Sequence, residues 1–168
     1  MSERVYNVLF VCAGNSARSA FGEMLVNRWG AGNFVGHSAG SAPSDEVHPL
    51  ALKLLTEQGH DVSGLHTKSW LKYSHDEAEA MDFVFTVCDD AAAESCPTWP
   101  GEPITAHWSI PDPAKASGSP AEQMIAFREA YAMLEMRVKL FLSLPLAKLD
   151  RIAIHHEVTK IGQLAHAA

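Results

Sequence analysis

A short apolar run that leads straight into a loop of small residues is the feature that most constrains this fold. The run covers residues 5–11 and is rich in β-branched and aromatic side chains, which is typical of a strand buried on both faces of a sheet. The loop that follows consists of Cys12, Ala13, Gly14, Asn15, Ser16, Ala17 and Arg18. From Ser19 the spacing becomes helical, and the side chains expected on the buried stripe are Phe21, Met24, Leu25 and Trp29.

This order of elements predicts an anion-binding loop that contains a reactive thiol. Amides in the first turn of a helix lack intrahelical acceptors and carry the positive end of the helix dipole, so they bind anions. Gly14 and Asn15 tolerate left-handed backbone, which lets successive amides turn inward, and Arg18 adds a planar fork that matches a tetrahedral oxyanion. The same positive field favours the thiolate of Cys12. We therefore predict a nucleophilic site for phosphate-like substrates.

Two other interpretations of the loop are weaker. A cysteine at the end of a core strand is often an inert hydrophobic residue, and a nearby arginine is often a surface charge. Here, however, the strand, cysteine, small-residue loop, arginine and helix coincide in the required order. A nucleotide-binding loop is disfavoured because there is no Gly-x-Gly-x-x-Gly pattern and no Lys-Ser/Thr pair after Gly14.

The run from Cys12 to Ser19 resembles the C-x5-R-S phosphate loop of the low-molecular-weight protein tyrosine phosphatases. It is equally similar to the loop of the arsenate reductases built on the same fold. The resemblance implies catalytic roles for Cys12 and Arg18. It implies substrate contacts from Ala13, Gly14, Asn15, Ser16, Ala17, Arg18 and Ser19. The Ser16 and Ser19 hydroxyls are expected to stabilise the Cys12 thiolate, and Asn15 to hold the loop backbone in a strained form.

Strand-like and helix-like segments alternate along the rest of the chain. Further strands are expected over residues 33–39, 81–87 and 104–109. Helices are expected over residues 48–58, briefly from Thr67, over residues 120–142 and over residues 146–164. The alternation predicts an α/β fold with a parallel sheet covered on both faces, and ligands at the carboxyl ends of its strands.

The resemblance makes this fold more specific. It implies a single three-layer domain with a four-stranded parallel sheet, helices on both faces and the first strand central. This is the flavodoxin-like fold of the low-molecular-weight phosphotyrosine phosphatases. We expect the domain to cover residues 1–144. A C-terminal helical tail, residues 145–168, is expected to pack on the domain or extend from it.

Two further cysteines follow the expected third strand. Cys88 comes directly after the strand, so it should emerge at the same edge of the sheet as Cys12, which favours a redox role over a structural one. Cys96 follows after seven intervening residues. A zinc site is disfavoured because this separation exceeds the usual two to four residues and His107 is the only plausible nearby ligand. We predict no metal site.

The segment with Cys88 and Cys96, together with residues 106–114, resembles the arsenate reductases much more than the phosphatases, which lack this cysteine pair. The resemblance implies a relay in which Cys88 attacks the Cys12 sulfur and Cys96 then attacks Cys88. The separation of Cys88 and Cys96 is one residue longer than is typical of the thioredoxin-linked reductases.

Some reductases of this type bind a potassium ion beneath the loop. The positions that match their ligands are Asn15, Glu23, Ser38 and Thr67. Ser69 stands where the family has an aspartate, so we do not predict the ion.

The dipeptide Asp112-Pro113 is first of all a turn signal. A phosphatase-type mechanism also needs a carboxylic acid near the leaving oxygen. In the resembled family an Asp-Pro pair after the fourth strand supplies this general acid, so we expect Asp112 to be catalytic. The phosphatases usually continue with an aromatic residue, whereas Ala114 follows here, which favours the reductases.

Charge and composition exclude several other classes of function. The net charge is −7 without any run of Lys or Arg, which argues against nucleic acid and acidic membranes as partners. The N-terminal apolar run is too short for a signal peptide, and no stretch is long enough to span a bilayer. Three cysteines without a secretory signal indicate a reducing compartment. We expect a cytoplasmic monomer.

The nucleophilic loop, together with the resemblance to the arsenate reductases, implies an enzyme that reduces arsenate to arsenite, with residual phosphatase activity. We expect no bound cofactor and an external thiol reductant, either thioredoxin or glutathione with glutaredoxin. The first alternative is a low-molecular-weight protein tyrosine phosphatase, in which water hydrolyses a phosphocysteine and Cys88 merely protects Cys12 from oxidation. The second alternative is a non-enzymatic module that binds oxyanions or metalloids.

Overall fold

The computed structural model describes residues 4–75, 77–88 and 99–164. Its centre is a four-stranded parallel sheet with the strand order β2-β1-β3-β4. The predicted parallel sheet is confirmed, and so is the central first strand that the resemblance implies. The strands are β1 (Tyr6–Cys12), β2 (Phe34–Gly40), β3 (Phe83–Thr86) and β4 (Ile104–His107). β3 and β4 are shorter than predicted, but the chain after each strand stays paired, because Ile110 donates its amide to the Val87 carbonyl at 3.0 Å.

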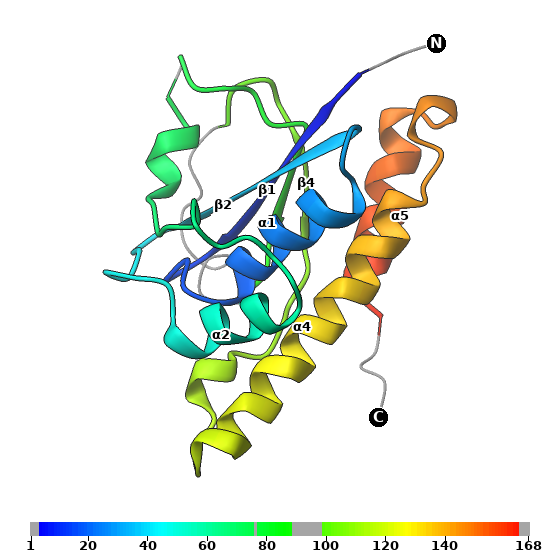
Figure 1. The fold of residues 1–168 in the computed structure, drawn as a ribbon. Coiled ribbons are helices and arrows are strands. Elements are labelled where there is room, and N and C mark those ends of the chain that lie inside the picture. The colour runs from blue at the N-terminus through cyan, green and yellow to red at the C-terminus, as the bar shows by residue number, and fades with distance from the viewer. Residues whose placement is uncertain (1–3, 76, 89–98, 165–168) are drawn as a thin grey trace.

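Helices cover the two faces of the sheet unequally (Figure 1). One face carries α1 (Arg18–Trp29) and α4 (Pro120–Leu142), while α2 (Pro49–Glu57) packs against α4. Ser38 of β2 points to this face, where its hydroxyl donates to Glu23 of α1. Neighbouring side chains in a strand point to opposite faces. His37 accordingly lies on the other face, against Tyr73 of the short 3-10 helix η1 (Trp70–Tyr73).

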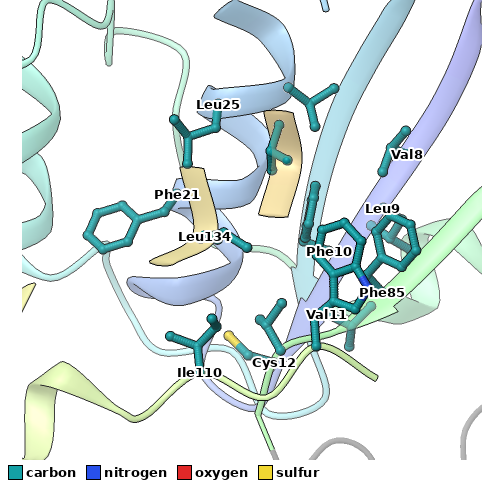
Figure 2. Close-up of a cluster of buried hydrophobic side chains, with 14 of the residues drawn as sticks. Val8, Leu9, Phe10, Val11, Cys12, Phe21, Leu25, Phe85, Ile110 and Leu134 are labelled. Atoms are coloured by element: carbon teal, nitrogen blue, oxygen red, sulfur yellow. The ribbon is translucent and has the colours of Figure 1, made fainter. Parts of the chain in front are cut away.

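The core lies between β1, β3 and the α1–α4 layer, and it is rich in aromatic rings (Figure 2). Phe10 and Phe85 come from the two inner strands and are fully buried. Trp108 stacks on Phe85 with ring centroids 4.0 Å apart, and Phe141 of α4 meets Phe85 edge-on. This packing fixes the carboxyl end of β1, where Cys12 is located, against the chain that follows β3 and β4.

The helical spacing in residues 120–142 predicted α4 correctly. All six apolar positions that the spacing selects are buried: Met124, Phe127, Tyr131, Leu134, Val138 and Phe141. The helix begins at a reciprocal cap in which Ser119 and Glu122 bond to each other's backbone amides. The prediction that Trp29 is buried was wrong. Its side chain is 49% exposed at the end of α1, where Lys139 lies over the ring and Glu135 accepts its indole N–H.

The single helix predicted over residues 146–164 is divided into two. A 3-10 turn, η3 (Leu146–Lys148), is followed by α5 (Arg151–Gly162), whose N-cap Asp150 accepts the Ala153 amide at 2.8 Å. α5 packs against β4 and α4 through Ile154, Val158 and Ile161. Among the helices of the described residues, none has the length and apolar character needed to cross a membrane.

Candidate active site

The sulfur atoms of Cys12 and Cys88 lie together at the carboxyl edge of the sheet. Cys12 is the last residue of β1, and its sulfur receives the Asn15 amide at 3.2 Å and contacts the Ser19 hydroxyl at 3.0 Å. The Cys88 thiol hydrogen-bonds to Cys12, and the Cys88 sulfur also accepts the Ala13 amide at 3.1 Å. Both cysteines are buried, and the fold brings them together although they are 76 positions apart in the sequence.

These contacts lower the pKa of Cys12 to about 6. The largest cause is the hydrogen bond from Cys88. Burial raises the pKa, because it disfavours the charged thiolate. The hydrogen bonds from Ser19 and the charge of Arg18 lower the pKa further. At neutral pH the Cys12 sulfur is therefore mainly a thiolate, which is the nucleophilic form of the side chain.

The loop backbone is held with its carbonyl groups pointing outward. The carbonyl oxygens of Cys12, Ala13, Gly14 and Ser16 accept, respectively, the amides of Ser41, Ala42, Ser44 and His48 at 2.9–3.2 Å. Loop amides are thereby left to turn toward the two sulfur atoms: the Asn15 amide donates to Cys12, and the Ala13 amide donates to Cys88. Among the described residues, no side chain caps the N-terminus of α1. The first-turn amides are therefore open to an anion.

Asn15 fixes the conformation of the loop through its backbone and its side-chain hydrogen bonds. Its φ is 51°, in the left-handed region that asparagine tolerates, and its side chain is buried. The side-chain amide donates to the Ser19 hydroxyl at 2.8 Å, and its oxygen accepts the Lys68 amide at 2.9 Å. Because the Ser19 oxygen already accepts this bond, its own proton is available to the Cys12 thiolate.

Arg18 and Asp112 face each other at the rim of the loop. One Arg18 nitrogen donates to the Ile110 carbonyl at 3.1 Å, and another lies 3.5 Å from an Asp112 carboxylate oxygen. Figure 2 shows the Ile110 side chain beside Cys12. Asp112 also accepts the Ala114 amide at 2.9 Å, as N-cap of the 3-10 turn η2 (Pro113–Lys115). A carboxyl group and a guanidinium are thus both adjacent to the loop that follows Cys12.

The region around Glu23 and Ser38, which the sequence analysis considered for a potassium ion, already contains a cation in this chain. The Lys68 ammonium lies 3.6 Å from a Glu23 oxygen that also accepts the Ser38 hydroxyl at 2.6 Å. Burial lowers the pKa of Lys68. A potassium ion here would be repelled by the ammonium, so these residues do not fit the ion. Within the described residues no cluster of three or more potential metal ligands occurs.

Most of the residues singled out in the sequence meet in one place. The loop residues 12–19, Cys88 and Asp112 surround a common site, whereas Cys96 lies outside the described residues. Sequence reasoning missed two backbone groups, the Ile110 carbonyl that holds Arg18 and the Lys68 amide that holds Asn15. Backbone groups have no residue signature, so no signal in the sequence points to them.

Comparison with known proteins identifies relatives of this chain. Residues 7–153 match the family model "Low molecular weight phosphotyrosine protein phosphatase". An arsenate reductase of Shouchella clausii is 33% identical over 141 residues, which cover 84% of this chain and 96% of that protein. A glutaredoxin arsenate reductase of Synechocystis sp. is 32% identical over 106 residues, which cover 63% of this chain and 77% of that protein. The solved thioredoxin-dependent arsenate reductase of Corynebacterium glutamicum superposes with a TM-score of 0.64 and 26% identity, covering 88% of this chain and 66% of that one.

Proposed function

The chain belongs to the low molecular weight phosphotyrosine protein phosphatase family, and from this premise we propose that it reduces arsenate to arsenite. Arsenate has the tetrahedral shape and negative charge of phosphate, so the loop amides and the Arg18 fork suit both anions. The bound anion would lie over the Cys12 sulfur, with Asp112 beside one of its oxygens.

In the first step the Cys12 thiolate attacks arsenic, and a sulfur–arsenic bond forms. One arsenate oxygen leaves as water, and Asp112 acts as the general acid that supplies a proton to it. Arg18 and the loop amides hold the remaining oxygens, where negative charge is concentrated during the attack. The low pKa of Cys12, about 6, keeps the nucleophile ionised at neutral pH.

In the second step the Cys88 sulfur attacks the Cys12 sulfur as a thiolate. A Cys12–Cys88 disulfide forms, the sulfur–arsenic bond breaks, and its electron pair stays on arsenic, which leaves as arsenite. Two thiols thus supply the two electrons that convert As(V) to As(III). Cys96 then attacks Cys88 and transfers the disulfide away from Cys12. An external dithiol or glutathione system restores the thiols, as the relatives that depend on thioredoxin or glutaredoxin suggest.

The observation that carries this proposal is the contact between Cys88 and Cys12. A phosphatase releases its product by attack of water on the phosphocysteine and needs no second thiol. Here a second thiol, two residues after the end of β3, is hydrogen-bonded to the nucleophile. This is the position from which it can displace a reduced product.

The proposal is tested by following NADPH consumption with arsenate, thioredoxin and thioredoxin reductase. The wild type is compared with Cys12→Ser, Cys88→Ser and Cys96→Ser, and each assay is repeated with glutathione and glutaredoxin. Loss of turnover in Cys12→Ser and Cys88→Ser supports the reaction as written, and its loss in Cys96→Ser adds the third cysteine to the relay. A wild type that reduces no arsenate with either system but hydrolyses an aryl phosphate would instead be a phosphatase.

A further inference from the structure

A buried arginine on α4 joins the residues that follow α5 to the segment that leads to Asp112. The Arg137 side chain is 2% exposed, and its guanidinium donates to the Ser109 carbonyl at 2.9 Å and to the Leu164 carbonyl at 3.1 Å. Burial lowers the pKa of Arg137, yet a guanidinium stays charged in proteins. A buried charge is costly unless it is bound by polar groups, so these two carbonyls must hold their positions.

α5 touches the same segment at two further points. The Trp108 indole N–H donates to the Val158 carbonyl of α5 at 2.9 Å, and the Trp108 side chain is fully buried. At Gly162, the last residue of α5, a β-carbon would collide with the His107 carbonyl oxygen and the Trp108 ring. The three contacts fall on three consecutive residues, 107–109, immediately after β4.

The segment held in this way leads directly into the active site. Ile110, the next residue, accepts Arg18 through its carbonyl and donates its amide to the carbonyl of Val87, the neighbour of Cys88. Asp112 follows two residues later, beside Arg18. A displacement of Ser109 would therefore move the acceptor that orients Arg18.

We propose that α5 and Arg137 are positioning elements of the oxyanion site. They hold residues 107–109 so that the Ile110 carbonyl and Asp112 fix the Arg18 fork over the loop. Most of α5 lies beyond residue 153, where the family match ends, so this support comes from a part of the chain that the family model does not cover. The inference rests on the proposed function in taking residues 12–19 as the oxyanion site.

The test compares Arg137→Met with Arg128→Met, the same substitution at an exposed position of α4 that pairs with Glu57. Inorganic phosphate is titrated as a protectant of Cys12 against iodoacetamide, and kcat and KM are measured with arsenate. We expect Arg137→Met to raise the phosphate Kd and the arsenate KM roughly tenfold, because a charge-assisted contact of Arg18 is misaligned. Arg137→Lys should recover part of the loss, and Arg128→Met should match the wild type.

A purely structural role for Arg137 would lower the melting temperature without changing the phosphate Kd well below it. An Arg137→Met protein that is folded and binds phosphate like the wild type would therefore overturn the proposal. If Arg137→Met does not fold, the phosphate Kd is measured for Gly162→Ala instead. Gly64→Ala is the control, because a β-carbon at Gly64 would have no atom within 4 Å. A wild-type phosphate Kd in folded Gly162→Ala overturns the role of α5, and a raised Kd supports it.

The two proposals fail in different ways. A wild type that neither binds phosphate nor reduces arsenate would overturn the proposed function, and the role of α5 with it. An active wild type whose Arg137 and Gly162 variants bind phosphate normally would overturn only the role of α5.

Discussion

The Ser19 hydroxyl oxygen lies 3.0 Å from the Cys12 sulfur, and Asn15 donates to the same hydroxyl at 2.8 Å. The loop, the first turn of α1 and the nucleophile are therefore linked by consecutive hydrogen bonds. Together with the Cys88 thiol, this arrangement accounts for the low pKa of Cys12.

The acidity of Cys12 should depend on both neighbours, in a definite order. Removing either hydrogen bond to the thiolate raises the pKa of Cys12 from about 6, and Cys88→Ala should raise it more than Ser19→Ala, since the Cys88 bond is the larger cause. The measurement is the pH dependence of iodoacetamide labelling at Cys12, resolved by peptide mass spectrometry. Equal labelling profiles in the wild type and Cys88→Ala would contradict this order.

Arg18→Lys should not behave as a conservative change. A lysine ammonium cannot contact the Ile110 carbonyl and present a planar fork to an oxyanion at once. We expect phosphate binding to weaken by about 1.5–3 kcal/mol, the usual cost of a lost hydrogen bond to a charged group. The Kd comes from protection of Cys12, with Arg128→Lys as the matched control on the protein surface. Retention of wild-type affinity in Arg18→Lys would show that the fork is not used.

Asp112→Asn removes the acid but keeps the size of the side chain. The amide oxygen can still accept the Ala114 amide, so the η2 turn should persist. We expect kcat with arsenate to fall roughly 10²- to 10⁴-fold, the range for loss of a general acid. Labelling of Cys12 should keep its pH profile, because Asp112 is not among the causes that lower the pKa of Cys12. An unchanged kcat would assign the proton to another group.

Asn15→Ala should destabilise the folded protein. The change deletes two buried hydrogen bonds and leaves alanine in left-handed backbone. We expect a loss of about 2–4 kcal/mol in the free energy of unfolding, measured with urea. Glycine adopts left-handed backbone without strain but also lacks the side chain. The free energy of unfolding of Asn15→Gly should therefore fall by about 1 kcal/mol less than that of Asn15→Ala. Equal losses in the two variants would mean that backbone strain contributes nothing.

His60 should make stability sensitive to acid. Burial is the main cause that lowers its pKa from 6.5 to about 4, and its ring bonds to the Tyr131 hydroxyl at 2.7 Å. Between these two pH values the unfolded state binds more protons than the folded state, so stability falls as the pH falls. Urea titrations from pH 7 to pH 4 should show a steeper loss in the wild type than in His60→Gln. Parallel losses in the two proteins would refute the assignment to His60.

Apolar spacing and the order of elements along the chain predicted those parts of the fold that depend on neighbouring residues. The spacing of apolar residues identified α4 and its buried face, and the order of strand, loop and helix placed Cys12 at the end of β1 and the loop before α1. The prediction that Trp29 is buried failed because the apolar spacing continues to the end of α1, beyond the core. There Trp29 contacts Lys139 and Glu135, which are more than a hundred residues away in the sequence.

The contacts that orient the site are long-range, so the sequence did not disclose them. Arg18 meets a carbonyl 92 residues away, and Asn15 meets an amide 53 residues away. Arg137 is a partial exception. It lies three residues after Leu134 and one before Val138, on the buried stripe of α4, so its burial could have been read from the helical spacing. That it binds the carbonyl groups of Ser109 and Leu164 could not be predicted from the spacing.

The most direct test of the central claim is a single turnover with arsenate in the absence of any reductant. Reduced Cys96→Ser protein is mixed with one equivalent of arsenate, quenched with an alkylating agent, and analysed by peptide mass spectrometry and arsenic speciation. We expect one arsenite and one Cys12–Cys88 disulfide per protein molecule. Unreduced arsenate together with free, alkylated Cys12 and Cys88 would contradict it.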